Sequence, residues 1–411
     1  MTTAIVDRES GTGRTRMVLI AILVLLFLLL MVLAIFAYRL LQPAGKPDAE
    51  SLPPGIEWVR SIYGYGPSEA EQFYRPEDAD IAPDGTIWGV DSAHTRILGF
   101  NPDGSFKVMI STGGRADQPG RMQLVSGIAT DEDGNVFACD FGREKVISFS
   151  EEGEFLLEWD VPLPIECDVR GDTVAVCTAY GVALFDRKGT PITKFGTRGS
   201  REEQFDGPHG IALGEDGTVY VSDTENNRVK AYTQDGDLLW IRGVKRSEAA
   251  GETEDESPFQ IPAGMTVDDN GRVVLVDPFQ FQILVLDPNN AGEVVGEYGD
   301  FGTEDGRFVY PTGIGYDASR DWFVVADTTN DRLQVVRIPG SSSNPFSAIR
   351  RLLTGPWWIC SIPLILLLIA FLVAASSRRR RSGEESAQLD ARSPQGLGVS
   401  TEGKGESTQA V

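Results

Sequence analysis

The chain has 411 residues with 60 acidic and 37 basic side chains, and its formal net charge at pH 7 is −23. A chain this acidic repels nucleic acids and anionic lipid headgroups, so the composition argues against nucleic-acid binding and favours cations or basic partners. The same acidity also keeps a domain soluble, which is the simpler interpretation of the charge. The length could hold more than one ordinary domain, but the apolar residues divide the chain differently.

Two apolar runs are each long enough to cross a bilayer as a helix. The first covers residues 17–38, and the second covers residues 356–376 with a Trp-Trp pair near its start. Four arginines, 378–381, follow the second run, and arginines beside a span are retained on the cytoplasmic side. We therefore expect a two-pass protein of the cell membrane with both termini in the cytoplasm. The alternative for the first run is a cleaved signal peptide, but its apolar core is too long for one.

This topology places the acidic surplus of the chain in an extracytoplasmic domain between the two runs. The predicted segments are a cytoplasmic N-terminal tail (1–16), a transmembrane helix (17–38), a linker (39–55), the extracytoplasmic domain (56–340), a second linker (341–355), a second transmembrane helix (356–376), and a basic, then disordered cytoplasmic tail (377–411).

Six stretches between the apolar runs repeat one pattern. Each has a short apolar run, a tight turn, a second apolar run and a closing polar residue, and these closing residues are Asp91, Asp140, Thr178, Asp223, Asp277 and Asp327. Short strands repeated at this period are typical of β-propeller blades. We predict third strands at 95–100, 144–149, 181–185, 227–232, 282–286 and 331–336. Fourth strands are predicted at 106–110, 155–159, 191–195, 238–241 and 294–298.

The sixth blade lacks a fourth strand of its own, because the chain leaves the repeat after Ile338-Pro339. Residues 56–63 have the pattern of the missing strand. A ring of sheets must close to hide its edges, so we expect residues 56–66 to complete the last blade.

The repeated units resemble NHL repeats, most clearly at 208–223 and in the linkers 195–208 and 298–311. The resemblance, to NHL-repeat proteins of a membrane-anchored bacterial type, implies an all-β fold. The expected architecture is a six-bladed NHL-type β-propeller flanked by two transmembrane helices. Blade three departs from the pattern at Thr178, and blade five departs from it at 277–281.

The resemblance also suggests a function, by analogy with the extracellular propeller sensors of bacterial receptor kinases. It implies a membrane-tethered binding, scaffold or sensor module that recognises an extracytoplasmic protein, peptide or glycan. The loops after the second strands combine aromatic and polar side chains, as interfaces do. The candidate ligand-binding residues come from these loops, together with the inner-strand residue His209. They are Asp91, His94, Phe141, Arg143, Tyr180, His209, Asn226, Phe279, Phe281 and Asn330. The recurring aspartates and Arg96, Arg228 and Arg332 also have an architectural interpretation, as turn caps and strand braces.

Two metal sites known in related propellers can be compared with this chain. Some NHL propellers are lyases that hold zinc with several inner-strand histidines, and the positions that we align with those hold Asp78, Val125, Pro164, His209, Ala263 and Thr312. Because catalytic zinc takes about three protein ligands, and only His209 of this set suits it, we expect no zinc site.

Lactonase-type six-bladed propellers hold a divalent cation in the central channel. Glu77, Asp78, Glu166 and Asp168 are inner-strand acids that could bind Ca²⁺ there, since hard cations prefer several oxygen ligands. This gives the alternative function, a hydrolase or lactonase-like enzyme that depends on a channel cation. Exposed acids are commonly just solvated, so the primary expectation is a protein with no cofactor.

Three cysteines lie in the predicted domain, and an odd number cannot all pair within it. Cys139 and Cys177 hold the same position, just before the closing residues of neighbouring blades. They could form a disulfide or remain as small buried core residues, and we favour the latter. The segment 245–257 is an acidic insertion that we expect to form a surface loop.

Overall fold

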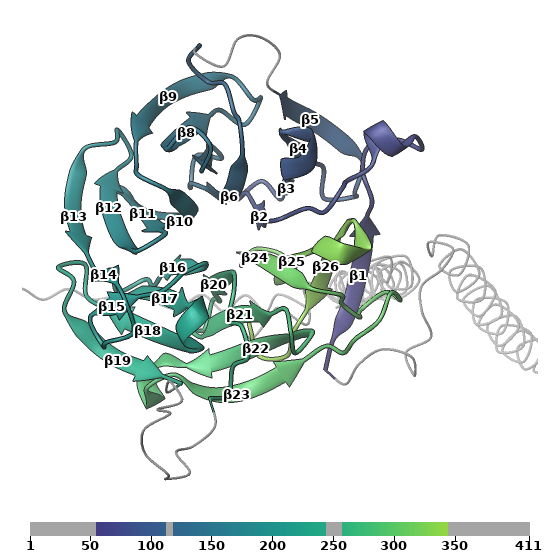
Figure 1. Ribbon diagram of the computed structural model, residues 1–411. Coiled ribbons are helices and arrows are strands. Elements are labelled where there is room, and N and C mark those ends of the chain that lie inside the picture. The colour runs from purple at the N-terminus through teal and green to yellow at the C-terminus, as the bar shows by residue number, and fades with distance from the viewer. Residues whose placement is uncertain (1–54, 112–117, 244–256, 344–411) are drawn as a thin grey trace, which may run out of the picture. The chain divides into compact units, whose positions relative to one another are not determined.

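The computed structural model describes residues 55–111, 118–243 and 257–343. In these residues six four-stranded antiparallel sheets follow one another around a ring (Figure 1). The predicted all-β, six-bladed propeller is therefore confirmed. Single 3-10 turns are the helical elements within the described ranges: η2 (Glu69–Glu71), η3 (Ser92–His94), η4 (Thr224–Asn226), η5 (Pro288–Asn290) and η6 (Thr328–Asn330).

The strands of each blade follow the chain from the inner to the outer edge. Blade one contains β2 (Ala79–Ile81), β3 (Ile87–Asp91), β4 (Arg96–Phe100) and β5 (Phe106–Ser111). Blade two contains β6 (Val125–Thr130), β7 (Val136–Asp140), β8 (Lys145–Phe149) and β9 (Phe155–Asp160). Blade three contains β10 (Pro164–Arg170), β11 (Thr173–Thr178), β12 (Gly181–Asp186) and β13 (Pro191–Phe195).

The remaining blades repeat this arrangement. Blade four contains β16 (Ile211–Leu213), β17 (Val219–Asp223), β18 (Arg228–Tyr232) and β19 (Leu238–Arg242), after a parallel pair in its linker, β14 (Thr197–Arg198) and β15 (Gln204–Phe205). Blade five contains β20 (Met265–Val267), β21 (Val273–Asp277), β22 (Gln282–Asp287) and β23 (Glu293–Tyr298). Blade six contains β24 (Pro311–Asp317), β25 (Trp322–Asp327) and β26 (Arg332–Arg337).

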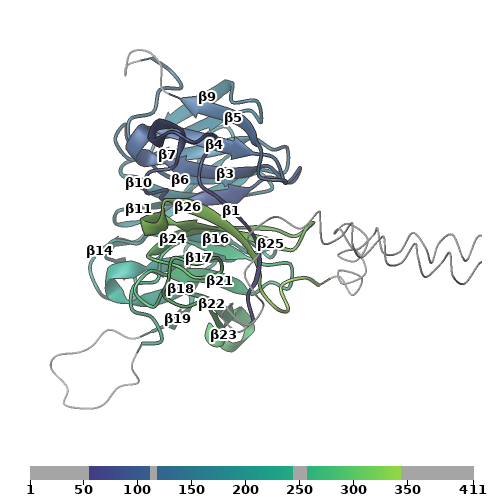
Figure 2. The same ribbon diagram turned by 90° about the vertical axis from the view of Figure 1, so that its right-hand side faces the viewer.

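The fourth strand of blade six comes from the beginning of the described chain. β1 (Glu57–Ile62) pairs antiparallel with β26, with Glu57 opposite Arg337 and Ile62 opposite Leu333. Figures 1 and 2 show β1 at the outer edge of this blade. The prediction that the ring closes through residues 56–66 is therefore confirmed for the strand, and the pairing covers the outer edge of β26.

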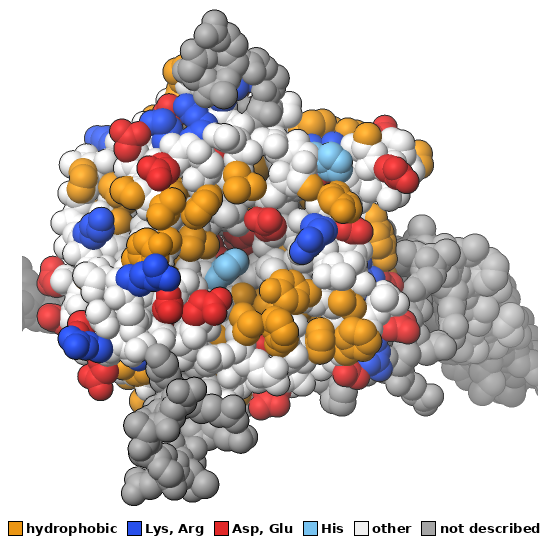
Figure 3. All heavy atoms as spheres, in the orientation of Figure 1, with side chains coloured by type: hydrophobic (Ala, Val, Ile, Leu, Met, Phe, Trp, Pro, Cys, Tyr) orange, Lys and Arg blue, Asp and Glu red, His pale blue; other side chains and the backbone are white. Residues whose placement is uncertain are grey.

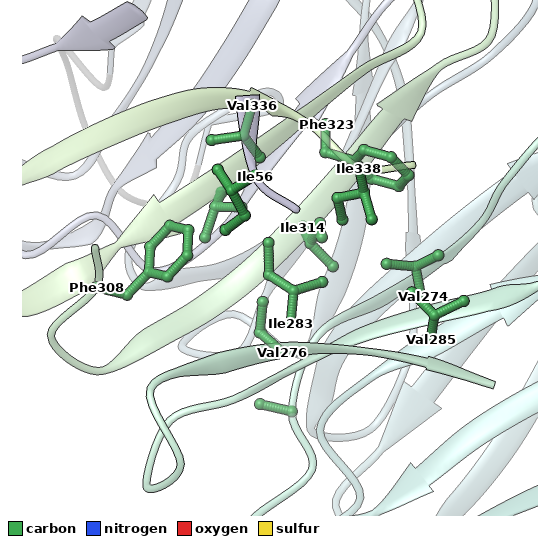
Figure 4. Packing of buried hydrophobic residues seen from close by; sticks show 12 residues of the cluster. Ile56, Val274, Val276, Ile283, Val285, Phe308, Ile314, Phe323, Val336 and Ile338 are labelled. Atoms are coloured by element: carbon green, nitrogen blue, oxygen red, sulfur yellow. The ribbon is translucent and has the colours of Figure 1, made fainter. Parts of the chain in front are cut away.

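Apolar residues of neighbouring blades pack face to face and form the core. The second strand of every blade is almost entirely buried, because each of its faces lies against another blade. Figure 4 shows the cluster between blades five and six, where Ile56 and Ile338 pack beside Val276 and Ile283. Residues from both ends of the described chain thus share one apolar cluster. At about 25 cal/mol per Å² of buried apolar surface, this packing stabilises the closed ring.

The closing aspartates connect each blade to the linker that precedes it. In blade six, Asp327 accepts a hydrogen bond from the backbone N–H of Val309 (2.8 Å) and one from the guanidinium of Arg332 (2.8 Å). Arg332 in turn donates to the linker carbonyls of Glu304 and Arg307. The same aspartate–arginine pairs occur in blades one and four, at 2.7 Å for Asp91–Arg96 and for Asp223–Arg228. These contacts confirm the architectural interpretation of the recurring residues.

Hydroxyl groups after three of the closing aspartates connect neighbouring blades. Ser92 donates to the carbonyl of Val125, Thr224 to Pro262 and Thr328 to Pro76. The last contact joins blade six to blade one, so it also closes the ring.

The buried cysteines are free. Cys139, Cys167 and Cys177 carry no disulfide and lie in the apolar core, which confirms the core interpretation over a Cys139–Cys177 bridge.

Several predicted segments lie outside the described residues. They are both apolar runs (17–38 and 356–376), both tails, most of both linkers, and residues 245–256 of the acidic insertion. Within the described ranges, no helix has the length and apolarity needed to cross a bilayer.

Candidate functional site

The inner strands surround the centre of the ring, and their register shows which residues are equivalent. On the inner strand of each blade, one position lies opposite the residue that precedes the closing residue of the second strand. Gly127 and Gly313 hold this position in blades two and six, and Glu166 holds it in blade three. Backbone hydrogen bonds assign Asp78, Gly210 and Gly264 to this position in the other blades. Four blades thus have glycine where blades one and three have an acid.

This register corrects the alignment made from the sequence. The true equivalents of His209 are Glu77, Ser126, Ile165, Ala263 and Thr312, one residue away from the predicted Asp78, Val125 and Pro164. Bulges lie next to Val125, Pro164 and Pro311, at the start of three of the inner strands.

The glycines allow the inner strands to approach one another closely. A Cβ on Gly264 would lie 2.6 Å from the backbone oxygen of Thr312, and one on Gly127 would lie 2.7 Å from the backbone of Glu166. Only an unsubstituted Cα fits at these contacts.

The inner-strand acids hydrogen-bond to the inner strands of other blades. Asp78 accepts from the N–H of Ile128 in blade two (2.7 Å), and Asp168 accepts from the N–H of Leu213 in blade four (2.7 Å). These amides lie on the inner edge of their sheets, where no further strand can pair with them. The carboxylates therefore replace a missing strand partner and join adjacent blades.

Glu166 reaches two blades at once. Its carboxylate accepts hydrogen bonds from the backbone N–H groups of Ile211 in blade four and Met265 in blade five. Asp80, an acid that the sequence analysis did not single out, accepts from the N–H and the hydroxyl of Thr130 at 2.8 and 2.7 Å. The available signal was its spacing, since it lies two residues after Asp78 on the same side of β2.

These four acids line a small pocket at the centre of the ring, together with Ile211, Met265 and Ile314. Burial raises the pKa of Asp78 and of Glu166 well above the usual range, and the negative charge of Glu166 adds to the effect on Asp78. Burial raises the pKa of Asp80 to about 6. The channel therefore disfavours negative charge, although four acids line it.

Two further titratable groups lie where this channel opens. The Nδ1 atom of His209 lies 3.7 Å from Glu166 Oε2, is enclosed, and has no hydrogen-bond partner, while the side chain as a whole is 37% exposed. Burial lowers the pKa of His209, and desolvation raises the pKa of Glu77. We call Glu77, Asp78, Glu166 and His209 the channel mouth.

The predicted metal ligands can be compared with this geometry. Glu77, Asp78, Glu166 and Asp168 all come from the inner strands of blades one and three, as expected. In the part of the chain that the structure describes, no group of three or more His, Cys, Asp or Glu side chains is arranged to hold a metal ion. Carboxylate oxygens of Asp78, Glu166 and Asp168 already accept backbone hydrogen bonds, so Ca²⁺ would have to displace these bonds or share the oxygens.

The loops after the second strands lie on one face of the propeller, which we call the loop face. Several polar candidates there are occupied by contacts within their own blades. Asp91 is fully buried beside Arg96, while Asn226 and Asn330 donate to Asp223 and Asp327 and to linker carbonyls. His94 contacts Asp91 at 3.0 Å, and Arg143 pairs with Glu158 at 3.0 Å.

Three of the aromatic candidates, in contrast, are exposed, while Phe281 is half-buried. Phe141 is 36%, Tyr180 42% and Phe279 49% exposed. Two linker residues that the sequence analysis missed lie beside the predicted phenylalanines: Phe301 is 4.9 Å from Phe281, and Tyr310 is 5.7 Å from Phe279, measured between ring centroids. We call Phe279, Phe281, Phe301 and Tyr310 the aromatic patch. Figure 3 shows hydrophobic side chains gathered over blades five and six, beside a central hollow with acidic and histidine side chains.

Two residues of the patch have a left-handed backbone. Phe281 has φ of 59° and Tyr310 has φ of 62°. A bulky aromatic residue is unfavourable in this region, and the turn position of Phe281 holds Thr95, Glu144, Asn227 and Asp331 in other blades. Strained backbone of this kind is concentrated at functional sites.

Comparisons with known proteins agree with the fold. The model of the NHL repeat matches residues 205–232. NHL repeat-containing protein 3 from mouse is 29% identical over 219 residues, which cover 48% of this chain and 60% of that protein. The human protein of the same name is 26% identical, covering 47% of this chain and 58% of the relative. The chain thus spans about 60% of the length of these curated relatives.

Solved structures that superpose on this chain include two enzymes. A gluconolactonase from Xanthomonas campestris superposes with a TM-score of 0.48 at 17% identity, covering 69% of this chain and 99% of that one. A streptogramin B lyase superposes with a TM-score of 0.44 at 15% identity, covering 66% and 80%. The strand order of the described residues, together with the sequence matches, shows that this protein is a six-bladed β-propeller carrying an NHL repeat.

Proposed function

We propose that the propeller is a binding module whose loop face recognises a protein, peptide or glycan, as part of a scaffold or sensor. The observation that supports this most is the aromatic patch, in which Phe279 and Phe301 are 49% and 58% exposed. Aromatic side chains supply much of the binding energy of interfaces, because they bury a large area with few rotatable bonds.

The fold does not require aromatic residues in these loops. Blades one, four and six have Ser92, Thr224 and Thr328 after the closing aspartate, and each hydroxyl connects two blades. Blades two and five have Phe141 and the segment 278–281 in the corresponding turns. The same turn is thus built from polar residues where it supports the ring and from exposed aromatic residues elsewhere, which favours a binding role for the latter.

Site-specific photocrosslinking tests this function in intact cells that express the full chain. A photoreactive amino acid at Phe279 should give discrete crosslinked products, while the same group at Ile192, which is 52% exposed on β13, serves as the control. Equal patterns at both positions would contradict a specific binding face.

We also propose that the module lies outside the cytoplasm, held by the apolar runs 17–38 and 356–376. The support is the length of the runs and the arginines 378–381. A Glu154→Cys variant should react with a membrane-impermeant maleimide in intact cells, because Glu154 is exposed. Labelling only after lysis would contradict this topology.

The second candidate function is a hydrolase or lactonase-like enzyme with a channel cation. The convergence of Asp78, Asp80, Glu166 and Asp168 on one space supports it. Elemental analysis of the purified full chain, before and after chelation, tests this function. A stoichiometric divalent ion whose removal lowers the melting temperature would favour it, and a metal-free protein unchanged by chelator would contradict it.

A further inference from the structure

The channel mouth and the aromatic patch adjoin on the loop face. Tyr310 belongs to the patch, and two residues later the hydroxyl of Thr312 donates to the backbone carbonyl of Glu77 (2.6 Å). Glu77 belongs to the channel mouth, so one short stretch of backbone connects the two. Figure 3 likewise shows hydrophobic side chains directly beside the central hollow.

The channel mouth has an excess of acidic groups. Three carboxylic acids, Glu77, Asp78 and Glu166, meet there with one histidine, whose Nδ1 remains without a hydrogen-bond partner. Arg75 lies close enough to influence Glu77, but its side chain is exposed. Among the described residues, His209 is the basic side chain within ion-pair distance of these acids, and no lysine or arginine lies that close to them.

The three acids differ in how much of their hydrogen-bonding capacity is occupied. Asp78 and Glu166 accept from backbone amides of neighbouring blades. Glu77 is half-buried, and the Oγ atom of Ser92 beside it already donates to the carbonyl of Val125. Glu77 is thus the acid best placed to pair with a group arriving from outside.

A long basic side chain suits this arrangement. Lysine and arginine extend a charged group on an apolar stem, so the stem can pass the patch while the charge reaches the carboxylates. A buried charge-assisted hydrogen bond to Glu77 would add specificity to the apolar contact. A neutral glycan would contact the aromatic rings and leave Glu77 without a cationic partner.

We propose that the loop face binds an extended segment of a partner protein, with a lysine or arginine in the channel mouth beside Glu77 and a neighbouring apolar side chain on the aromatic patch. This inference rests on the proposed binding function and names the chemistry of its partner. The formal charge of −23 on the chain would also attract a basic segment and speed its association.

Selection from a library of displayed random decapeptides, with the purified full chain as the target, tests the proposal. Selected peptides should be enriched in lysine or arginine next to an aromatic or aliphatic residue. A synthetic copy of one selected peptide should bind about tenfold more weakly when its basic residue is replaced by norleucine, because the charge pair with the mouth is lost. This comparison needs no protein variant, so it holds even if a variant fails to fold.

Two matched protein variants locate the contact. Glu77→Gln should weaken binding of the synthetic peptide about tenfold. Glu154→Gln removes the same charge from the hairpin between β8 and β9, at the opposite end of the strands from the loop face, and should leave binding unchanged. Phe279→Ala should also weaken binding, and an unchanged melting temperature in each variant shows that the fold is intact.

The outcomes separate this inference from the proposed function. Peptides that lose affinity with Phe279→Ala, but not with Glu77→Gln or norleucine, would overturn the cation site and leave the binding face standing. A library that yields no peptide sensitive to Phe279→Ala, while neutral glycans bind in a Phe279-dependent way, would overturn the peptide partner only. Absence of any Phe279-dependent ligand would overturn both.

Discussion

Lys230 of blade four and Gln334 of blade six are two chemically different side chains in one structural role. Both are fully buried on the third strand of their blade. The Nζ atom of Lys230 lies 3.1 Å from Asp223 and donates to the linker carbonyls of Glu202 and Gln204. The Nε2 atom of Gln334 lies 2.9 Å from Asp327 and donates to the linker carbonyl of Arg307. The buried lysine of blade four and the neutral amide of blade six therefore make the same two kinds of contact, one with the closing aspartate and one with the linker.

Replacing Lys230 with glutamine should therefore be tolerated. We expect Lys230→Gln to change the free energy of unfolding by less than about 1.5 kcal/mol, because the amide can still donate to the linker. Lys230→Met fills the space without donating, and it should cost about 1–3 kcal/mol by leaving the carbonyls unpaired. Chemical denaturation of the two variants measures the difference, and equal losses would contradict the shared role.

The stability of the wild-type protein should also depend on pH through Lys230. Desolvation lowers the pKa of this lysine in the folded state to about 8, below its usual value of 10.5. Between these values the unfolded chain holds a proton that the folded protein has released, so stability rises with pH across this window. Lys230→Gln should lack this rise. Parallel curves for both proteins between pH 8 and 10 would contradict the shift.

Asp327 supports the most connected of the buried ion pairs described above. Its carboxylate faces Arg332, which is itself 1% exposed, and also accepts from Asn330, Gln334 and the N–H of Val309. Asp327→Ala should cost about 3–5 kcal/mol, because it leaves a buried arginine without a counter-charge. Asp300 pairs with Arg307 at the surface, so Asp300→Ala should cost at most about 1 kcal/mol. Similar melting temperatures for both variants would contradict the distinction.

The acids of the channel should make the propeller less stable as the pH rises from 4 to 6. Burial raises the pKa of Asp80 to about 6 in the folded state, from an ordinary value of 3.8. In that window the folded protein holds a proton that the unfolded chain has lost, so stability falls with rising pH. Asp80→Asn keeps an acceptor for the N–H of Thr130 and should make this decline smaller. An identical pH profile in the variant would show that Asp80 does not titrate in this range.

The three cysteines of the propeller should resist thiol reagents in the native state. Burial raises the pKa of the Cys139 and Cys177 thiols, and the hydrogen bond with Cys139 together with burial raises the pKa of the Cys167 thiol, so little thiolate forms at neutral pH. Alkylation followed by mass spectrometry should leave all three unmodified until the protein is unfolded. A modification-resistant Cys139–Cys177 peptide that appears only after reduction would show a disulfide instead.

Much of the architecture follows from local patterns in the sequence. The third and fourth strands lie within a residue or two of their predicted positions, because each strand alternates between positions that pack on neighbouring blades and is ended by a tight turn. The closing strand was predictable for a related reason, since a blade with three strands needs a fourth to cover its edge. Aspartate and arginine recur at fixed positions of the repeat, which predicted that they stabilise the blades. The hydrogen bonds between these side chains confirm that prediction.

The candidate site was less predictable. His209 was aligned with Asp78, Val125 and Pro164, and each of these lies one residue away from the position that the pairing of the inner strands assigns. Phe301 and Tyr310 belong to a linker whose pattern shows no surface role. They join the aromatic patch because the linker between blades five and six runs beside Phe281 and Phe279.

The sequence by itself determined the number of blades, the order of the strands and the strand that closes the ring. Those features depend on periodicity, which is a local property of the chain. The tertiary structure alone decided which acids meet at the channel and what each carboxylate binds. Asp78 reaches Ile128, and Glu166 reaches Met265, across distances in sequence that no local pattern encodes. Such contacts exist only once the inner strands have been brought around the ring, where edge amides need acceptors that no further strand can provide.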